Sequence, residues 1–241
     1  MSVAHRVLSP NEREAAAAGR VALAIMTKVP RAGRVKTRLT PPLTPEEAAA
    51  LNICFLRDTA AAIAGADEQA QGIGCYTPVG EEAAYRDIFP ADFQLIAQRD
   101  GDFGVRLAGA VEDLLAVGFA AVCLIDSDSP TVPASAFAEA INLLLQPADS
   151  IVLGPSDDGG YYLIGMKQLH REVFSGIDWS TERVLAQTKE RAASAGLPVH
   201  LLPDGFDIDN EASFRRLQGE LRAPNESRAP ATAEFLRHFQ G

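Results

Sequence analysis

The stretch AAVCLIDSDSPT, residues 120–131, decides how this sequence folds. It begins with six consecutive apolar residues, 120–125, which is the pattern of a β-strand buried on both faces. Two aspartates alternate with serines directly after that run, and Pro130 then ends strand pairing. Ligands of open α/β sheets bind just outside the carboxyl ends of the strands, so Asp126 and Asp128 are expected at a ligand site.

The alternating carboxylates suit a divalent metal ion. Mg²⁺ prefers oxygen ligands, usually one or two carboxylates, with water and substrate phosphates completing its shell. Asp126 and Asp128 therefore indicate a metal–diphosphate site. A turn in which Asp and Ser side chains bond to their own backbone gives the same pattern, and this pair of aspartates taken alone favours the turn.

The composition sets the scale of the protein and excludes several classes of partner. A chain of 241 residues with 47% hydrophobic and 22% charged residues is typical of one soluble domain with a substantial core. The formal charge of −10 argues against nucleic acid and anionic membranes. No apolar run approaches the roughly 18 residues of a membrane span, and no signal-peptide core is present. Three scattered cysteines without metal-ligand spacing indicate a reducing compartment, so we expect a cytoplasmic location.

Predicted strands and helices alternate along most of the chain. Apolar runs predict strands at 21–26, 73–76, 93–97, 120–125, 150–153 and 197–202. Helical periodicity and capping residues predict helices at 45–64, 103–117, 134–145, up to about 194, and from 211 onwards. This alternation predicts an α/β fold with a mostly parallel sheet and helices on both faces. We expect a polar N-terminal extension at 1–19, one domain at 20–222 and a C-terminal tail at 223–241.

A basic loop, TKVPRAGRVKTRL at residues 27–39, follows the first predicted strand. Five basic residues in an acidic chain suggest an anion site, because Lys offers phosphate a point charge and Arg a bidentate fork. Lys28, Lys36 and Arg38 are the candidate phosphate ligands. The spacing is not that of a Walker loop, and a merely solvated loop would be equally consistent with it.

Two further segments carry carboxylates beyond predicted strands. In GPSDDGGYYLIG, residues 154–165, Asp158 lies at an Asp-Gly-Gly turn, where it could act as a base toward an acceptor; a plain hairpin explains the pattern slightly better. Asp207 and Asp209 follow the last strand and alternate, so both can approach one ion. A helix cap is the alternative for Asp209. The single tryptophan, Trp179, is either a stacking platform or a structural residue.

In combination, these segments resemble one family. They read VALAIMTKxPxxGxVKTRL at 21–39, DSDSP at 126–130, GPSDDGGYYLIG at 154–165, IDWST at 177–181 and DID at 207–209. The set is similar to the small bacterial glycosyltransferases called rSAM/selenodomain-associated or arsenosugar-associated. The resemblance covers about residues 21–220. It implies the Rossmann-like GT-A fold of the nucleotide-diphospho-sugar transferase superfamily, a three-layer α/β/α arrangement.

The resemblance also implies roles for individual residues. The loop at 36–39 is similar to that of 2-phospholactate and phosphoenolpyruvate guanylyltransferases, which share the fold. The positions that match metal ligands in those relatives are Asp128, Asp207 and Asp209, with Asp126 an additional candidate from its spacing. The implied cofactor is Mg²⁺ or Mn²⁺. We expect the three carboxylates to gather without a cationic side chain among them.

The sequence thus predicts a metal-dependent transferase. The leading expectation is a glycosyltransferase that moves a sugar from a nucleotide-diphospho-sugar to a small acceptor. One alternative is a nucleotidyltransferase that joins an NTP to a phosphorylated small molecule and releases pyrophosphate. Another is a catalytically silent nucleotide-binding domain. The sequence leaves open the base, the sugar, the acceptor and the oligomeric state.

Overall fold

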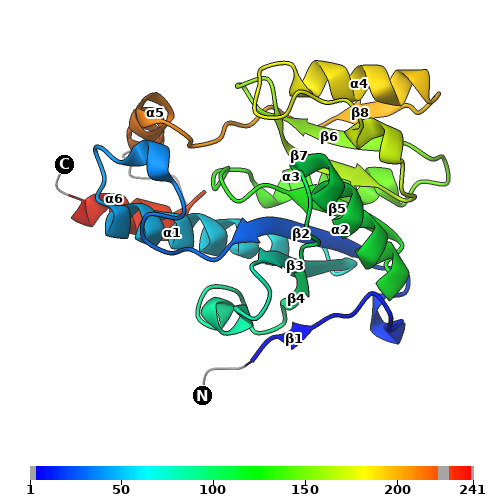
Figure 1. Ribbon diagram of the computed structural model, residues 1–241, viewed down its shortest axis with the longest axis horizontal. Coiled ribbons are helices and arrows are strands. Elements are labelled where there is room, and N and C mark those ends of the chain that lie inside the picture. The colour runs from blue at the N-terminus through cyan, green and yellow to red at the C-terminus, as the bar shows by residue number, and fades with distance from the viewer. Residues whose placement is uncertain (1–3, 222–227, 240–241) are drawn as a thin grey trace.

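Strand β5 (Ala121–Ile125) lies in the middle of an eight-stranded sheet, as its apolar sequence predicts (Figure 1). The computed structural model describes residues 4–221 and 228–239. The other strands are β1 (Arg6–Val7), β2 (Val21–Lys28), β3 (Ala70–Thr77), β4 (Gln94–Ala97), β6 (Ile151–Pro155), β7 (Tyr161–Met166) and β8 (Val199–Leu201). Their order in the sheet is β1-β4-β3-β2-β5-β7-β6-β8. Only β7 runs antiparallel to its neighbours in this sheet, so the prediction of a mostly parallel sheet is confirmed.

Helices cover both faces of this sheet. They are α1 (Pro45–Ala64), α2 (Phe103–Val117), α3 (Ala134–Leu144), α4 (Val184–Ser194), α5 (Glu211–Leu221) and α6 (Pro230–His238). Buried residues of α1 and α3 share one hydrophobic cluster, and those of α2 and α4 share the cluster on the opposite face. The three layers therefore follow the α/β/α order that was predicted.

The alternation of side chains along β2 explains why both faces need cover. Leu23 and Ile25 belong to the cluster under α1 and α3, whereas Ala22 and Ala24 belong to the cluster under α2. All four side chains are fully buried. Successive residues of a strand point to opposite faces, so a strand that is apolar throughout is stable only between two layers.

Helix α1 begins where the sequence signal placed it. The Thr44 hydroxyl accepts a hydrogen bond from Glu47 N at 3.2 Å, and the Glu47 carboxylate accepts one from Thr44 N at 2.8 Å. This reciprocal pair satisfies two of the amide groups that a helix start leaves unpaired, and Pro45 at the first position needs no partner for its nitrogen.

A third hydrophobic cluster joins the C-terminal helices to the rest of the domain. It gathers buried residues of α1 and α5 with Leu39 of the 3-10 helix η2 (Thr37–Leu39), and Phe235 and Leu236 of α6 pack against it. Figure 1 shows α5, α6 and the loop that contains η2 together at one end of the molecule. Phe235 and Leu236, in the expected C-terminal tail, therefore dock on the domain.

Several details differ from the sequence interpretation. Within the expected N-terminal extension, β1 pairs with β4 and extends the sheet by one strand, and Ala15–Ala17 form a 3-10 helix, η1. The other short helices, η3 (Glu82–Tyr85) and η4 (Arg171–Phe174), are also 3-10 turns. None of the described helices is long and apolar enough to cross a bilayer.

Candidate active site

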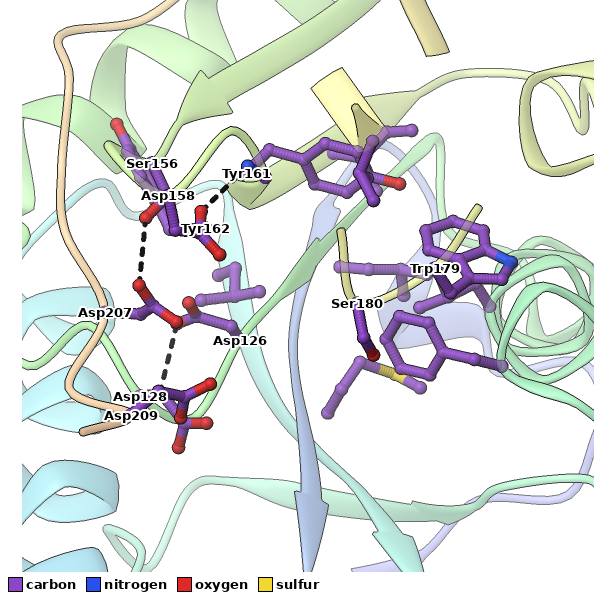
Figure 2. Close-up of a pocket in the computed structure, with 18 of the residues that line it drawn as sticks. Asp126, Asp128, Ser156, Asp158, Tyr161, Tyr162, Trp179, Ser180, Asp207 and Asp209 are labelled. Carbon is purple, nitrogen blue, oxygen red and sulfur yellow. Dashed lines mark hydrogen bonds between the residues drawn. The ribbon is translucent and has the colours of Figure 1, made fainter. Parts of the chain in front are cut away.

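Three segments that follow strands bring five aspartates into one cavity. The segments are 126–129 after β5, 156–160 between β6 and β7, and 205–209 after β8. The cavity has a volume of about 220 Å³. Its aspartates are Asp126, Asp128, Asp158, Asp207 and Asp209 (Figure 2). The structure thus brings together every acidic residue that the sequence singled out.

Backbone hydrogen bonds fix segment 205–209 against the ends of the strands. Gly205 N donates to Pro155 O of β6 at 2.8 Å, and Ile208 N donates to Asp128 O at 3.0 Å. The segment is therefore held between β6 on one side and the loop after β5 on the other. This pairing places both of its alternate aspartates beside Asp128, although they are about 80 residues away in the sequence.

Lys36 lies between two of these aspartates. Its Nζ is 2.9 Å from Asp128 Oδ1 and 3.0 Å from Asp209 Oδ1, and it donates a hydrogen bond to Ile208 O at 2.7 Å. Burial of the ammonium, whose side chain is 4% exposed, disfavours its charge, but the two carboxylates outweigh burial and raise the pKa of Lys36. The prediction that the carboxylates gather without a cationic side chain is wrong, because Lys36 relieves their repulsion.

The two aspartates of segment 205–209 differ in their electrostatic environment. Burial opposes ionisation of Asp209, but the adjacent Lys36 ammonium outweighs it and lowers the pKa of Asp209. Burial raises the pKa of Asp207, and the negative charges of Asp158 and Asp209 add to that effect, so it reaches about 6. The Ser156 hydroxyl donates to Asp207 Oδ1 at 3.4 Å.

Asp126 is occupied by the turn that it begins. Its Oδ1 accepts hydrogen bonds from the backbone nitrogens of Asp128 and Ser129, both at 3.2 Å, and its Oδ2 accepts one from Ser129 Oγ at 2.8 Å. Burial, followed by the charge of Asp128, raises the pKa of Asp126 to about 8. These contacts account for Asp126 as the residue that shapes the loop.

The turn that carries Asp158 is the predicted hairpin between β6 and β7, and it also lines the cavity. Asp158 is exposed and accepts a hydrogen bond from Gly160 N at 2.8 Å. Gly159 has φ +87°, and a Cβ atom there would lie 2.2 Å from the carbonyl oxygen of Glu182. Only glycine therefore allows this turn to pack against the segment before α4. Asp158 is separate from the other aspartates in sequence but joins them in space.

A second cavity, of about 380 Å³, adjoins the first. Lys28 at the end of β2, Lys36, and Arg38 of η2 all line it, so the three candidate phosphate ligands converge. The two cavities share the side chains of Asp128, Asp209 and Ser180. A basic compartment and an acidic compartment thus meet at the ion pairs of Lys36.

The wall of the first cavity that faces away from the aspartates is apolar. Figure 2 shows Trp179 on the opposite side of the cavity from the carboxylates. Phe103 contacts Trp179, and Met26 and Leu107 line the cavity and belong to the same hydrophobic cluster as Trp179. The rings of Phe103 and Trp179 contact each other edge to face, with centroids 5.0 Å apart. Sequence reasoning identified Trp179 as a candidate stacking residue but missed Phe103. The sequence feature that could have identified Phe103 is a bulky aromatic residue at the first position of a predicted helix, α2.

The donor atoms of the cavity suit a hard divalent cation, because they are carboxylate oxygens and already hold the Lys36 ammonium as a cation. In the part of the chain that the structure describes, however, no three Asp, Glu, His or Cys side chains are arranged to enclose an ion. A metal ion at this position would require these side chains, Lys36 among them, to move.

Known structures share the fold of this chain. A protein from Desulfovibrio desulfuricans G20, proposed to be a nucleotide-diphospho-sugar transferase, is 28% identical with a TM-score of 0.79, over 90% of this chain and 96% of that one. The 4-diphosphocytidyl-2C-methyl-D-erythritol synthase of Anaerococcus prevotii DSM 20548 is 12% identical with a TM-score of 0.53, over 85% and 97%. A CMP:2-keto-3-deoxy-manno-octonic acid synthetase in complex with CTP is 13% identical with a TM-score of 0.53, over 84% and 98%.

These likenesses confirm the predicted Rossmann-like fold of the nucleotide-diphospho-sugar transferases. The 28% identity to the Desulfovibrio protein supports the prediction of a transferase. No protein of curated function matches the sequence. A family match covers residues 59–181, which is 123 of 241 residues and includes Asp126, Asp128, Asp158 and Trp179. Because the match spans half of its length, the chain belongs to the bacterial family DUF2064, whose description reads "Uncharacterized protein conserved in bacteria".

Proposed function

We propose that this protein is a glycosyltransferase that moves a sugar from a nucleotide-diphospho-sugar to a small acceptor. The observation that carries the proposal is the meeting of a basic and an acidic cavity at Asp128, Asp209 and Ser180. A diphosphate in the basic cavity would place the sugar that it carries at this junction. The acidic cavity then remains for the acceptor.

Lys28 and Arg38 are proposed to bind the phosphates, since both line the basic cavity and are exposed to it. Charged hydrogen bonds from such groups stabilise the negative charge that develops on a leaving diphosphate. Lys36 is proposed to neutralise Asp128 and Asp209 while no other cation is bound, and to turn to the phosphates when one is. Its position on the wall of the basic cavity supports this exchange.

Asp128, Asp207 and Asp209 are the proposed ligands of Mg²⁺ or Mn²⁺, with Asp126 a weaker candidate because the turn uses both of its oxygens. A divalent ion held there would supply positive charge to the leaving diphosphate. We also propose that the protein belongs to the narrower group of rSAM/selenodomain-associated or arsenosugar-associated glycosyltransferases, which its sequence resembles.

Asp158 is the proposed general base. It is exposed and lines the acidic cavity, and its only hydrogen bond in the described structure runs from Gly160 N to Oδ1, so Oδ2 has no hydrogen-bond partner. A carboxylate within hydrogen-bond reach of an acceptor hydroxyl can remove its proton as the new bond forms.

The leaving group distinguishes the proposal from the nucleotidyltransferase alternative. The protein is incubated with Mn²⁺ and a panel of nucleotide-diphospho-sugars, with transfer to water as the basal reaction, and in parallel with NTPs and phosphorylated acids. Release of nucleoside diphosphate from a nucleotide-diphospho-sugar supports the proposal. Pyrophosphate release from an NTP supports the alternative, and nucleotide binding without either product indicates a silent domain.

Adjacent aspartates provide a matched test of the base. Asp158→Asn is expected to reduce turnover by roughly 10²–10⁴ while nucleotide affinity changes only a few-fold. Asp157→Asn is the control, because Asp157 pairs with Arg216 and does not line the cavity. Equal turnover in the two variants would remove Asp158 from the catalytic assignment, and lost nucleotide binding in Asp158→Asn would indicate a metal role instead.

A further inference from the structure

The apolar wall of the aspartate cavity is unexplained by nucleotide or metal binding. Phe103 is 42% exposed although it is a large hydrophobic residue, and Trp179 beside it is only half-buried. Leu107 and Met26 continue the wall. Aromatic and aliphatic side chains that line a cavity while partly open to solvent are typical of a surface that a ligand covers.

This wall is built to a fixed shape. A Cβ atom on Gly104 would lie 2.8 Å from the carbonyl oxygen of Phe174 and 3.0 Å from Trp179 Nε1. Helix α2 can therefore begin against the indole only because residue 104 has no side chain. Phe103, at the first position of the same helix, meets Trp179 edge to face. The two aromatic rings are thus positioned before any ligand arrives.

The charge of the cavity decides which ligands it can accept. Five aspartates line it, and none of the described residues that line it is Lys, Arg or His. One divalent ion would balance two of these carboxylates, so negative charge remains in excess in the cavity. Arg106 lies 5.5 Å from the centre of the Phe103 ring, but it donates to Gln98 and does not line the cavity. A phosphate or carboxylate group would be repelled here, while the adjoining basic cavity would attract it.

We propose that this cavity binds the acceptor, and that the acceptor is an uncharged or cationic alcohol or amine with an apolar, ring-sized body. The role of this ligand as the acceptor rests on the proposed function. The preference of the cavity for uncharged or cationic ligands with an apolar body does not. The body lies against Phe103, Leu107 and Trp179, and the hydroxyl or amine points toward Asp158. Phosphorylated and carboxylated acceptors are excluded, including those of the nucleotidyltransferase alternative.

The transfer step balances with these groups. The acceptor oxygen or nitrogen forms a bond to the anomeric carbon of the sugar, and the bond from that carbon to the diphosphate oxygen breaks. Its electron pair leaves with the nucleoside diphosphate. The proton of the acceptor passes to the Asp158 carboxylate.

Because Trp179 is the single tryptophan of the chain, its fluorescence reports ligand binding in the cavity. Trp179 emission is followed during titration with four probes of similar ring size: 2-phenylethanol, 2-phenylethylamine, phenylacetate and phenyl phosphate. The full-length protein is used with and without saturating nucleoside diphosphate and Mn²⁺. We expect saturable changes with the alcohol and the amine, and at least tenfold weaker binding of the two anions.

Two residues on α2 provide a matched pair of variants. Phe103 and Val105 are both exposed hydrophobic residues, 42% and 52%, but only Phe103 lines the cavity. Phe103→Ser is expected to weaken binding of 2-phenylethanol roughly fivefold or more, because apolar contact area is lost. Val105→Ser is expected to leave it unchanged. Calorimetry with the same probe provides a readout that does not depend on how the Phe103 ring affects the indole.

The outcomes separate this inference from the proposed function. Three results would each overturn the inference. The anions bind as tightly as the alcohol, or neither the alcohol nor the amine gives a saturable response, or Phe103→Ser and Val105→Ser have equal effects. Calorimetric nucleoside diphosphate binding would still support the proposed function in those cases. If the protein binds the alcohol and the amine selectively but binds no nucleotide, the proposed function is overturned. The inference that the cavity prefers uncharged or cationic ligands is then still supported.

Discussion

Lys36 holds together two carboxylates that reach the site from different segments. Asp128 follows the central strand and Asp209 lies 173 residues away from Lys36 in sequence. A lysine that is 4% exposed between carboxylates that are 30% and 43% exposed is a partly buried ion triad. Removing one member of such a group leaves the remaining charges without compensation.

Lys36→Met is therefore expected to destabilise the protein in EDTA. Because both carboxylates remain partly solvated, the expected loss in the free energy of unfolding is about 1–3 kcal/mol, less than for a fully buried pair. Urea denaturation of this variant and of Lys36→Met with Asp209→Asn measures it. The double variant is expected to recover part of the loss. An unchanged unfolding free energy in Lys36→Met would contradict the role assigned to this lysine.

The raised pKa of Asp126, about 8, makes a prediction for pH dependence. A carboxyl group whose pKa is higher in the folded state stabilises that state below the unfolded pKa of about 3.9, and this contribution is lost as pH rises through the folded pKa. Without divalent ions, the unfolding free energy should decline between about pH 4 and pH 8. Asp126→Asn, which cannot ionise, should show a shallower decline. Denaturation series for the two proteins test this, and identical slopes would argue against a protonated Asp126.

Among the secondary-structure elements, α6 depends on a cap supplied by another helix. The Asp58 carboxylate of α1 accepts hydrogen bonds from Ala231 N at 2.9 Å, Thr232 N at 2.8 Å and Thr232 Oγ1 at 2.6 Å. A carboxylate at this point satisfies amide groups that the start of α6 leaves unpaired and opposes the positive end of the helix dipole. The sequence next to α6 does not reveal this cap, because Asp58 is more than 170 residues away.

Asp58→Ala is expected to destabilise the protein by about 1–2 kcal/mol, the range for loss of a helix cap. Hydrogen exchange should accelerate in α6 before it changes in α2, which serves as the internal control. Equal protection of α6 in the variant and the parent would show that the hydrophobic contacts of Phe235 and Leu236 suffice without the cap.

Local signals were sufficient for most elements. The capping box at Thr44 and the periodicity of 103–117 predicted α1 and α2 at their observed bounds, because caps and apolar periodicity act within a few residues. Strand β1 was not predicted, since a two-residue strand has no periodicity and exists only by pairing with β4. The ion pairs of Lys36 were also missed, because they depend on how distant segments meet and not on local pattern.

At the scale of the whole molecule, the sheet order brings the functional segments together. β2, which leads into the basic loop, is hydrogen-bonded to β5, and β5 is hydrogen-bonded to β7. The carboxyl ends of β2 and β5 therefore lie side by side, with the β6–β7 turn at the same edge. The sequence predicted a ligand site for Asp126 and Asp128 at the carboxyl end of a strand, and the resemblance implied that Asp128, Asp207 and Asp209 gather. It could not predict that the cavities divide into basic, acidic and apolar walls, because Phe103 and Trp179 meet only in the folded chain.

The basic cavity is notable because the chain as a whole is acidic. In a chain of net charge −10, Lys28, Lys36 and Arg38 line a single cavity, so positive charge is concentrated where an anion could bind. We propose that this cavity binds the diphosphate of a nucleotide with the help of a divalent ion at Asp128.

Calorimetry of nucleoside diphosphate binding tests that claim most directly, with Mn²⁺ and with EDTA. The parent protein should bind with strong metal dependence, and Asp128→Asn should lose that dependence. Arg38→Ala should lose about 1.5–3 kcal/mol of binding free energy, as for a hydrogen bond to a charged group. Arg34→Ala, in the same loop but outside the cavity, should bind as the parent does. Metal-dependent binding that persists undiminished in Asp128→Asn, or equal losses in the two arginine variants, would contradict the account.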